Sequence, residues 1–440
     1  MSSASEMDRR RFIKSSLATV AVAALLGDRA LAAPNRRQPN IILINADDLG
    51  YADLSCYGSE SIRTPNLDSL ARRGMRFTSF YASAPVCTPS RAGLMMGRYA
   101  VRSGLSYVLF PNDKTGITDS EITVGQVLQK AGYKTACIGK WHLGCTPESH
   151  PNRHGFDYYY GLLYSNDMGT MTKQGYPDIP LYRNEEVIER PADQSLLTER
   201  YTEEAVKFIR DNKNNPFFIY LPHNMPHWPH HASERFKKRT KAGVYAAAVE
   251  TIDWGVGEIM KTLRELGLEQ NTLVLFMSDN GPVLRPDRPG ASAKPLSGAK
   301  GNVFEGGQRV PLVAYWPAGI PAGSVCHQPV SNLDMLPTLA AICGGKTPTD
   351  RIIDGRNITK LLTNMGKMPD YAFFYNPGKT VPAVRYGKWK LRLEKGRQSV
   401  EKPELYNLDL DIGERRNLAK EHPEIVADLK ARIDAFLQTL

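Results

Sequence analysis

Four short apolar segments, each ending abruptly in polar residues, constrain the fold of this chain most. Uniformly apolar runs of this length are typical of strands buried on both faces, as in parallel or mixed sheets covered by helices. Ligands of open α/β sheets bind outside the carboxyl ends of such strands, so we expect the polar residues to meet at one edge. The segments are Asn40–Asn45 before Asp47 and Asp48, Thr135–Ile138 before Lys140 and His142, Pro216–Leu221 before His223 and His227, and Thr272–Met277 before Asp279 and Asn280.

The intervening stretches predict covering helices and a second, smaller unit. Apolar residues recur at helical spacing in Ser120–Ala131 and Ala246–Leu266. After Gly345 the chain changes to short segments such as Ala383–Leu391, and it ends in a predicted helix over Glu424–Leu437. We therefore predict an α/β fold with a large mixed β-sheet flanked by helices over residues 35–345. A smaller C-terminal α+β subdomain with an antiparallel sheet is expected over residues 346–440.

The N-terminus has the pattern of an export signal. Residues Asp8–Lys14 read D-R-R-R-F-I-K, an apolar stretch follows over Leu17–Leu26, and Ala30-Leu31-Ala32 supplies small residues at an A-x-A site. This pattern resembles a bacterial twin-arginine signal. The alternative, a membrane anchor, needs about 20 apolar residues to span a bilayer. We predict a signal peptide over residues 1–32, a periplasmic or secreted protein, and no stable membrane anchor.

Charge and cysteine usage exclude several classes of protein. The formal net charge is +10, but the basic residues are spread along the chain without a recognition helix or zinc-finger spacing, so nucleic acid is not an expected partner. The six cysteines form no C-x-x-C motif, which excludes a zinc ribbon. Cys137 and Cys145 could form a disulfide in an oxidising compartment, or Cys137 could be a buried free thiol.

The acidic strand ends predict a site for a hard cation. Asp47, Asp48 and Asp279 offer three carboxylates and Asn280 offers an amide oxygen. Such oxygen donors suit Ca²⁺ or Mg²⁺ rather than zinc. The alternative is that adjacent aspartates form only a turn or a helix cap.

A motif near residue 90 is the most specific signal in the chain. Cys87-Thr-Pro89-Ser-Arg91 resembles the C-x-P-x-R core of the formylglycine-dependent sulfatases, type I sulfatases of the alkaline phosphatase superfamily. Gly132–Gly144, which contains Lys140 and His142, resembles the second signature of that family. One residue departs from the family pattern: Met96 stands before Gly97, where a Thr, Ala or Arg is usual. Further blocks follow in family order: Ala46–Gly50, Pro226–Pro229, Ser278–Gly281, Gly298–Gly301, Glu305–Gly307, Glu404–Leu408 and Asn417–Ala419.

Tyr164-Ser165-Asn166-Asp167, which follows Gly155-Phe-Asp157, is most similar to the corresponding segment of arylsulfatase A and N-acetylgalactosamine-6-sulfatase relatives. The resemblance as a whole implies an alkaline-phosphatase-like fold. It also implies that a formylglycine-generating enzyme oxidises Cys87 to formylglycine, and that this residue joins Asp47, Asp48, Asp279 and Asn280 around Ca²⁺, with Mg²⁺ as the alternative.

The resemblance also assigns roles to the remaining polar residues. Arg91, Lys140 and Lys300 would bind the sulfate, His227 with Lys300 would assist the leaving oxygen, His142 would trigger sulfate elimination, and Asp279 would take the proton of the attacking hydroxyl. Ser165 and His223 are either substrate contacts or structural residues. With a divalent cation, the three aspartates and three basic side chains leave the site at +2, complementary to a sulfate monoester.

The expected function is hydrolysis of sulfate esters, either of sulfated carbohydrates or of aryl sulfates. Two alternatives remain from the sequence. The first is a phosphate mono- or diester hydrolase of the same superfamily, although such enzymes generally use other nucleophiles. The second is a non-catalytic binder of sulfated glycans, which would have lost Cys87 or a metal ligand, and neither is lost.

Overall fold

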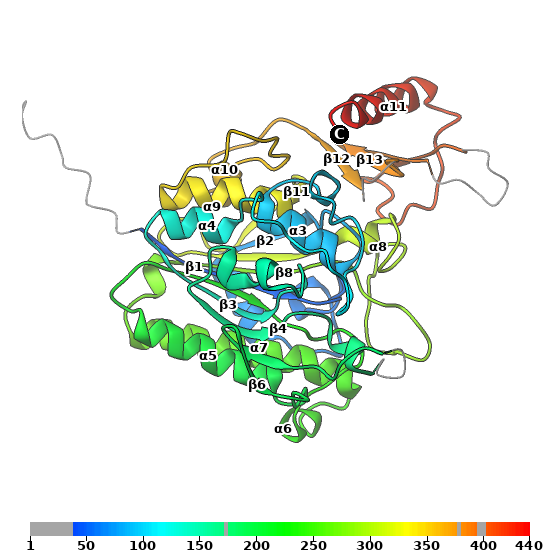
Figure 1. Cartoon of the computed structure of the whole chain (residues 1–440). Helices are drawn as coiled ribbons and strands as arrows, with labels where there is room; N and C mark the ends of the chain where they lie inside the picture. The colour runs from blue at the N-terminus through cyan, green and yellow to red at the C-terminus, as the bar shows by residue number, and fades with distance from the viewer. Residues whose placement is uncertain (1–37, 171–174, 376–379, 394–401) are drawn as a thin grey trace, which may run out of the picture. The chain divides into compact units, whose positions relative to one another are not determined.

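Two β-sheets organise the chain from Pro39 onwards (Figure 1). The structure is a computed structural model that describes residues 38–170, 175–375, 380–393 and 402–440. The predicted signal peptide over residues 1–32 lies outside these described residues, and so does the start of the predicted catalytic domain. Within the described ranges, no helix is both long and apolar enough to cross a membrane.

The four predicted strands are neighbours at the centre of the large sheet. They are β1 (Asn40–Ala46), β3 (Lys134–Lys140), β7 (Phe217–Pro222) and β8 (Thr272–Ser278). β1 pairs in parallel with both β7 and β8, and β7 pairs in parallel with β3. Every residue of these strands is buried except the first residue of β3. Their carboxyl ends therefore lie along one edge of the sheet, as the sequence predicts.

The outer strands make the sheet mixed, which confirms the predicted fold class. β4 continues the parallel arrangement beside β3, whereas β9 runs antiparallel to both β8 and β2. The order in the sheet is β10-β2-β9-β8-β1-β7-β3-β4-β5-β6, with β11 also paired to β2. The outer strands are β2 (Met75–Tyr81), β4 (Tyr158–Leu162), β5 (Leu181–Arg183), β6 (Glu186–Glu189), β9 (Arg309–Tyr315), β10 (Ser324–Cys326) and β11 (Val330–Ser331).

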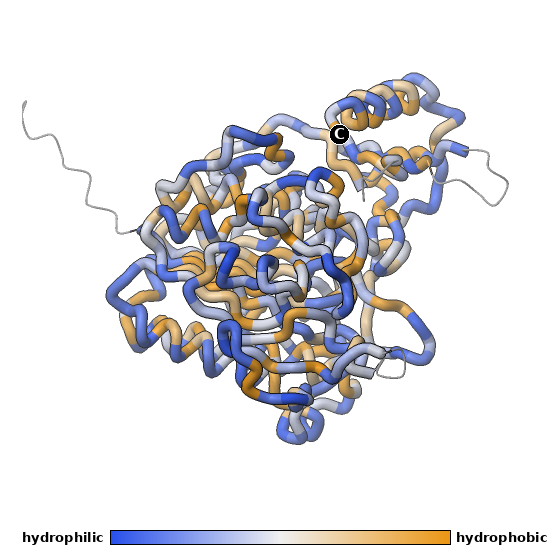
Figure 2. The backbone as a smooth tube through the Cα atoms, viewed as in Figure 1, coloured by the Kyte–Doolittle hydropathy of each residue, from blue (hydrophilic) through white to orange (hydrophobic). Residues whose placement is uncertain are grey.

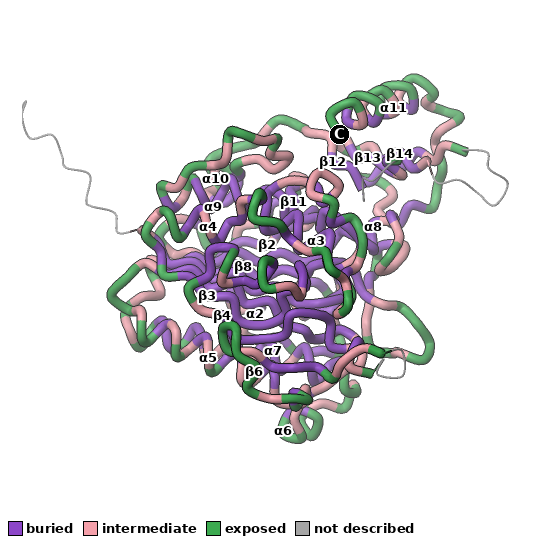
Figure 3. Tube along the Cα trace, in the orientation of Figure 1, coloured by how far each residue is buried: buried purple, intermediate pink, exposed green. Residues whose placement is uncertain are grey.

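Helices cover both faces of this sheet (Figure 1). One layer contains α2 (Pro65–Arg73), α5 (Leu197–Asp211) and α7 (Gly243–Glu265), and the other contains α3 (Cys87–Met96), α4 (Val124–Lys130) and α9 (Met335–Cys343). Figure 2 shows apolar segments concentrated in the sheet, and Figure 3 shows the same segments buried beneath helices with exposed outer faces. Short helices α6 (Glu234–Lys237), α8 (Glu305–Gln308) and α10 (Thr359–Leu362) lie in the connections.

The helix predicted over Ser120–Ala131 begins later than expected, at Val124. The reason is a capping box at Thr123: its hydroxyl accepts from the Gln126 amide at 3.1 Å, while the Gln126 side chain accepts from the Thr123 amide at 2.9 Å. The other helix predicted between the strands corresponds to α7 within a few residues at each end.

The C-terminal segment forms the predicted antiparallel sheet. Its strands are β12 (Ala372–Tyr375), β13 (Ala383–Tyr386), β14 (Trp389–Arg392) and β15 (Glu404–Asn407), and α11 (Pro423–Leu437) packs on β13 and β14. Leu391, Leu405, Leu429 and Phe436 belong to one buried cluster that joins this helix and sheet. The domain boundary at residue 345 stays a prediction.

A buried ionic network joins the C-terminal sheet to the segment that carries Lys300. Glu305, which is fully buried on α8, accepts from the ammonium of Lys390 on β14 at 3.0 Å and from the Tyr375 hydroxyl at 2.6 Å. The Lys390 ammonium also lies 2.8 Å from Glu414. One buried lysine therefore bridges two buried carboxylates, and Arg309 adds a second cation to Glu305 at 3.2 Å.

We expect Lys390→Met to lower the free energy of unfolding by about 3–5 kcal/mol, because it leaves Glu305 and Glu414 buried without this cation. Urea denaturation measures the effect. Lys388→Met is the matched control, since Lys388 is exposed beside the same strand and should cost about 1 kcal/mol or less. Equal losses in the two variants would contradict the role of the buried network.

Candidate active site

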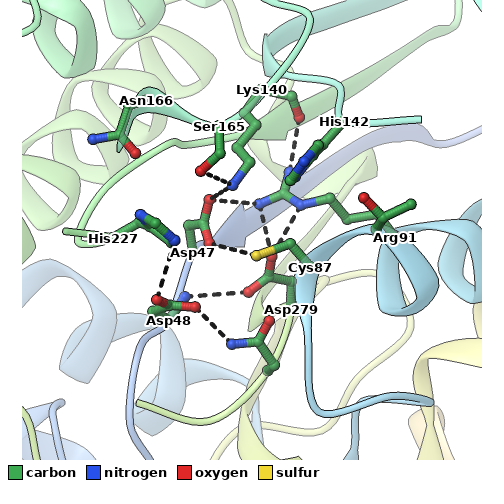
Figure 4. A network of polar contacts seen from close by, with 12 residues as sticks. Asp47, Asp48, Cys87, Arg91, Lys140, His142, Ser165, Asn166, His227 and Asp279 are labelled. Carbon is green, nitrogen blue, oxygen red and sulfur yellow. Dashed lines mark hydrogen bonds and ion pairs between the residues drawn. The ribbon is translucent and has the colours of Figure 1, made fainter. Parts of the chain in front are cut away.

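The carboxyl ends of five adjacent parallel strands bring the predicted site residues together (Figure 4). Each strand ends in a buried apolar run, and the polar residues begin where the chain leaves the sheet. A left-handed residue, Gly139, precedes Lys140, and a Cβ at Gly139 would lie 1.9 Å from the Pro222 carbonyl oxygen of β7. The contributing residues are Asp47 and Asp48 after β1, Asp279 and Asn280 after β8, His227 after β7, Lys140 and His142 at and after β3, and Ser165 after β4.

Helix α3 adds two further predicted residues. Cys87 is its first residue and Arg91 lies four positions later, so both side chains lie on one face. The free amide groups at this end of a ten-residue helix contribute partial positive charge around residue 87.

Arg91 is the cationic centre of the cluster. It is fully buried, and its guanidinium contacts Asp279 Oδ2 from Nε at 2.9 Å and from one terminal nitrogen at 2.8 Å. The same terminal nitrogen lies 3.2 Å from Asp47 Oδ2, and the other donates to the Lys140 carbonyl oxygen at 2.8 Å. Arg91 therefore ties strands β1, β3 and β8 together.

Two lysines complete the charge balance. The ammonium of Lys140 contacts Asp47 Oδ2 at 2.5 Å and donates to the Ser165 hydroxyl at 3.0 Å. The ammonium of Lys300 lies 2.6 Å from Asp48 Oδ1 and 3.3 Å from the Cys87 sulfur. Three buried or nearly buried cations thus face three buried carboxylates.

Burial and charge set the protonation states of two of these groups. Burial, followed by the neighbouring Asp47 carboxylate, raises the pKa of the Cys87 thiol well above its ordinary value. The same two causes raise the pKa of Asp279 to about 6, although Arg91 opposes them. Cys87 is therefore a neutral thiol near neutral pH, and Asp279 is a carboxyl whose proton affinity suits proton transfer there.

The predicted oxygen donors lie together and fit a hard cation. Ligand atoms of Asp47, Asp48, Cys87 and His227 lie within 4.8 Å of one another. Asp279 Oδ1 accepts from the Asp48 amide at 3.2 Å, and the Asn280 amide nitrogen donates to Asp48 Oδ1 at 2.7 Å. In the part of the chain that the structure describes, buried Asn280 Oδ1 has no hydrogen-bond partner, which leaves one oxygen donor spare at the cluster. His227 also belongs to this set of possible ligands, whereas the sequence analysis assigned it only to assisting the leaving oxygen.

Two of the site residues have unusual backbone conformations. Asp48 has φ of 61° and His142 has φ of 57°, both in the left-handed region. A non-glycine residue held there costs about 1–3 kcal/mol. Such conformations concentrate at functional sites, where the surrounding fold imposes them.

The contacts of the two histidines assign their tautomers. His142 Nε2 lies 3.0 Å from the Leu109 carbonyl oxygen, which only accepts, so this nitrogen carries the proton. His142 Nδ1 is buried without a hydrogen-bond partner among the described residues and is the basic atom. His227 Nδ1 likewise lies 2.5 Å from the Trp228 carbonyl oxygen, which leaves Nε2 facing Asp48 at 3.5 Å. Burial is the first cause that lowers the pKa of both rings.

The two candidate substrate contacts differ in position. Ser165 lies inside the cluster through its hydrogen bond with Lys140. His223 makes no polar side-chain contact with the cluster among the described residues; its ring packs against Tyr201 of α5 at 6.2 Å, and burial alone lowers its pKa to about 3. Its role as a substrate contact stays a prediction.

Cys137 and Cys145, for which the sequence left a disulfide open, are free thiols in the structure.

Sequence reasoning missed three supporting residues. Asn166 donates to the Pro229 carbonyl oxygen at 3.1 Å, which links the Ser165 segment to the His227 segment. The hydroxyl of Ser90 donates to the Asp279 carbonyl oxygen, and Asn332 donates to this hydroxyl at 3.0 Å. Asn166 and Ser90 lie inside the family-like motifs, so the sequence could have pointed to them. Asn332 lies outside these motifs, and no sequence pattern indicates its role.

Comparisons with protein families agree with this geometry. A family model described as "Sulfatase" matches residues 39–345, and one described as "N-sulphoglucosamine sulphohydrolase, C-terminal" matches residues 299–439. Arylsulfatase A of Homo sapiens is 38% identical over 90% of this chain and 87% of its own length. N-acetylgalactosamine-6-sulfatase of Mus musculus is 39% identical over 84% of this chain and 75% of its own length.

Solved structures show the same fold. The crystal structure of Ps i-CgsB in complex with k-i-k-neocarrahexaose superposes with a TM-score of 0.82 at 34% identity, covering 91% of this chain and 93% of that one. PsFucS1 sulfatase from Pseudoalteromonas sp. superposes with a TM-score of 0.82 at 28% identity, covering 96% of this chain and 93% of that one.

Proposed function

The chain therefore belongs to the sulfatase family, and we propose that it removes sulfate from sulfated carbohydrates through a formylglycine derived from Cys87 and one bound Ca²⁺ or Mg²⁺ ion. Its general activity is that of a sulfuric ester hydrolase. The observation that carries the finer proposal is the position of Cys87, at the start of α3 between Lys300 and Asp47. Two relatives support a carbohydrate substrate: one is named for N-acetylgalactosamine 6-sulfate, and the other is bound to a carrageenan-type hexaose.

The state of the Cys87 thiol argues for its conversion. A buried neutral thiol is a weak nucleophile, and a sulfated cysteine would have no hydroxyl with which to expel its sulfate. The hydrate of formylglycine has two hydroxyls, so one can attack sulfur and the other can release sulfate as the aldehyde reforms. A formylglycine-generating enzyme is the proposed maturation partner, and a twin-arginine signal is the proposed route to the periplasm or the exterior.

The metal would be held by Asp47, Asp48, Asp279 and Asn280, together with residue 87. When bound, a divalent cation supplies positive charge that offsets the aspartates and favours ionisation of a nearby hydroxyl. Hard oxygen donors favour Ca²⁺ or Mg²⁺ over zinc at this position.

The chain's own residues provide the remaining steps. Arg91, Lys140 and Lys300 attract the sulfate together with the amide end of α3. Asp279 accepts the proton of the attacking hydroxyl. Lys300 donates toward the leaving oxygen with the assistance of His227, and His142 Nδ1 is the base for release of sulfate.

Hydrolysis of paired esters tests the proposed function. We expect p-nitrophenyl sulfate or a sulfated sugar to be hydrolysed, and p-nitrophenyl phosphate to be turned over much more slowly at equal concentration. A phosphate monoester carries about −2 near neutral pH, so the cationic site should retain it and inorganic phosphate should inhibit. The measurement is kcat/KM for both esters. A value for the phosphate ester equal to or above that of every sulfate ester would overturn the assignment.

Removal of the metal is expected to abolish activity, and Ca²⁺ or Mg²⁺ should restore it. Adding the ion to the chelated protein should also raise its melting temperature. At an ion concentration of 100 times Kd, binding stabilises the folded state by about 2.7 kcal/mol. Asp48→Asn should lose this shift, whereas Asp253→Asn, a buried aspartate of α7 outside the cluster, should keep it. Stoichiometric zinc in the active protein would refute the oxygen-ligand site.

A further inference from the structure

We propose that Arg288, held on the face of Trp228, forms a second anion subsite beside the sulfate centre, which selects saccharides that carry a second sulfate group. This inference rests on the proposed function and concerns the substrate class of the same site. The guanidinium carbon of Arg288 lies 5.0 Å from the centre of the Trp228 ring. A cation–π contact uses none of the guanidinium N–H groups in a conventional hydrogen bond, so they remain available to an anion.

Within the described residues, the charge of Arg288 has only a long ion pair and no hydrogen-bonded carboxylate. Its Nε is buried without a hydrogen-bond partner within the described part of the chain, and the side chain is 28% exposed. The nearest carboxylate, Asp287, lies 3.8 Å away and makes a closer contact of 3.1 Å with Arg285. Arg285 is 58% exposed and thus represents an ordinary solvated arginine in the same loop. Arg288 differs from it by its aromatic support and its buried, unsatisfied donor.

The Arg288–Trp228 pair adjoins the catalytic residues. Trp228 directly follows His227, whose Nε2 lies 3.5 Å from Asp48. His230 contacts the Trp228 ring edge-on, with centroids 5.1 Å apart. Burial lowers the pKa of His230 to about 4, and His227 and Arg288 both add to the shift, so both side chains lie within electrostatic range of His230. An anion bound at Arg288 would therefore lie close to the scissile sulfate.

Contacts from two sides hold the pair in place. Ser292, in the loop of Arg288, donates its amide to Asp53 Oδ1 at 2.8 Å. Tyr245 of α7 donates its hydroxyl to the same carboxylate, and its ring contacts His230 at 5.1 Å. His230 in turn contacts Trp228, which closes a ring of contacts back to Arg288. A preorganised cation loses less entropy on binding an anion than a free surface arginine does.

The test is direct binding by calorimetry in the Cys87→Ala background, which needs no turnover. The probes are disulfated disaccharides that differ in sulfate positions, each compared with its monosulfated counterpart. We expect at least one disulfated isomer to bind about 10- to 100-fold more tightly than its counterpart, as charge-assisted hydrogen bonds contribute. Arg288→Gln should remove this preference, Arg288→Lys should retain part of it, and Arg285→Gln should keep it.

Three outcomes would overturn the subsite: no isomer is preferred, the preference survives Arg288→Gln, or Arg285→Gln removes it equally. Hydrolysis of p-nitrophenyl sulfate by the enzyme with Cys87 intact tests the proposed function separately. An enzyme without sulfatase turnover that still shows an Arg288-dependent preference would contradict the proposed function but not the subsite.

Discussion

Replacing Cys87 with alanine is expected to lower kcat by roughly 10⁴- to 10⁶-fold, the loss typical of removing a catalytic nucleophile. The cationic cluster around residue 87 would remain, because Arg91, Lys140 and Lys300 pair with aspartates rather than with the sulfur alone. The fold should therefore persist, with an unfolding transition close to that of the unmodified chain. The measurements are turnover of a sulfate ester and urea denaturation.

Two further cysteine variants test whether the loss of activity is specific to the chemistry of residue 87. Cys87→Ser keeps a hydroxyl that can attack sulfur but lacks the second one, so it should also fail to turn over. Cys56→Ala changes a half-buried thiol in another part of the chain and should leave kcat unchanged. Mass spectrometry of the peptide containing residue 87 should detect the aldehyde in active protein. An active enzyme whose Cys87 is an unmodified thiol would refute the mechanism.

Arg91→Gln is expected to lower the free energy of unfolding by about 3–5 kcal/mol and to abolish activity. The substitution leaves Asp47 and Asp279 buried without the guanidinium that contacts both. Arg98→Gln is the matched control near the end of the same motif, because Arg98 reaches its closest carboxylate, Glu121, only at 3.8 Å. It should cost about 1 kcal/mol or less.

The loss in Arg91→Gln should shrink as the pH falls. Without Arg91 the folded-state pKa of Asp279 rises above its value of about 6, and the variant then binds more protons when folded than when unfolded. Its stability relative to the unmodified chain therefore increases as the pH falls through that pKa. A stability difference that stays constant between pH 8 and pH 5 would show that the buried carboxylates are not its cause.

Local sequence was sufficient to predict the strands that carry the site and the polar residues at their carboxyl ends. The run Asn40–Asn45 predicts a strand buried on both faces, and the abrupt change at Asp47 marks where the chain leaves the sheet. The same pattern before Lys140, His227 and Asp279 places all of them at carboxyl ends of strands. This works because a strand buried on both faces appears in the sequence as a continuous apolar run that ends where the chain leaves the sheet. The motif around Cys87 added the chemistry through its resemblance to a family.

Only the tertiary structure decided which side chains meet across long separations. No local pattern pairs Glu305 with Lys390, assigns the proton of His142 through the Leu109 carbonyl, or separates His223 from the cluster next to which the sequence places it. The support of Arg288 by Trp228 is of the same kind. Such contacts depend on how strands, helices and loops pack, and each partner taken alone resembles an ordinary surface or core residue. The sequence by itself thus determined the sheet, its polar edge and the candidate nucleophile, whereas packing decided the charge pairing, the tautomers and the surroundings of the candidate site.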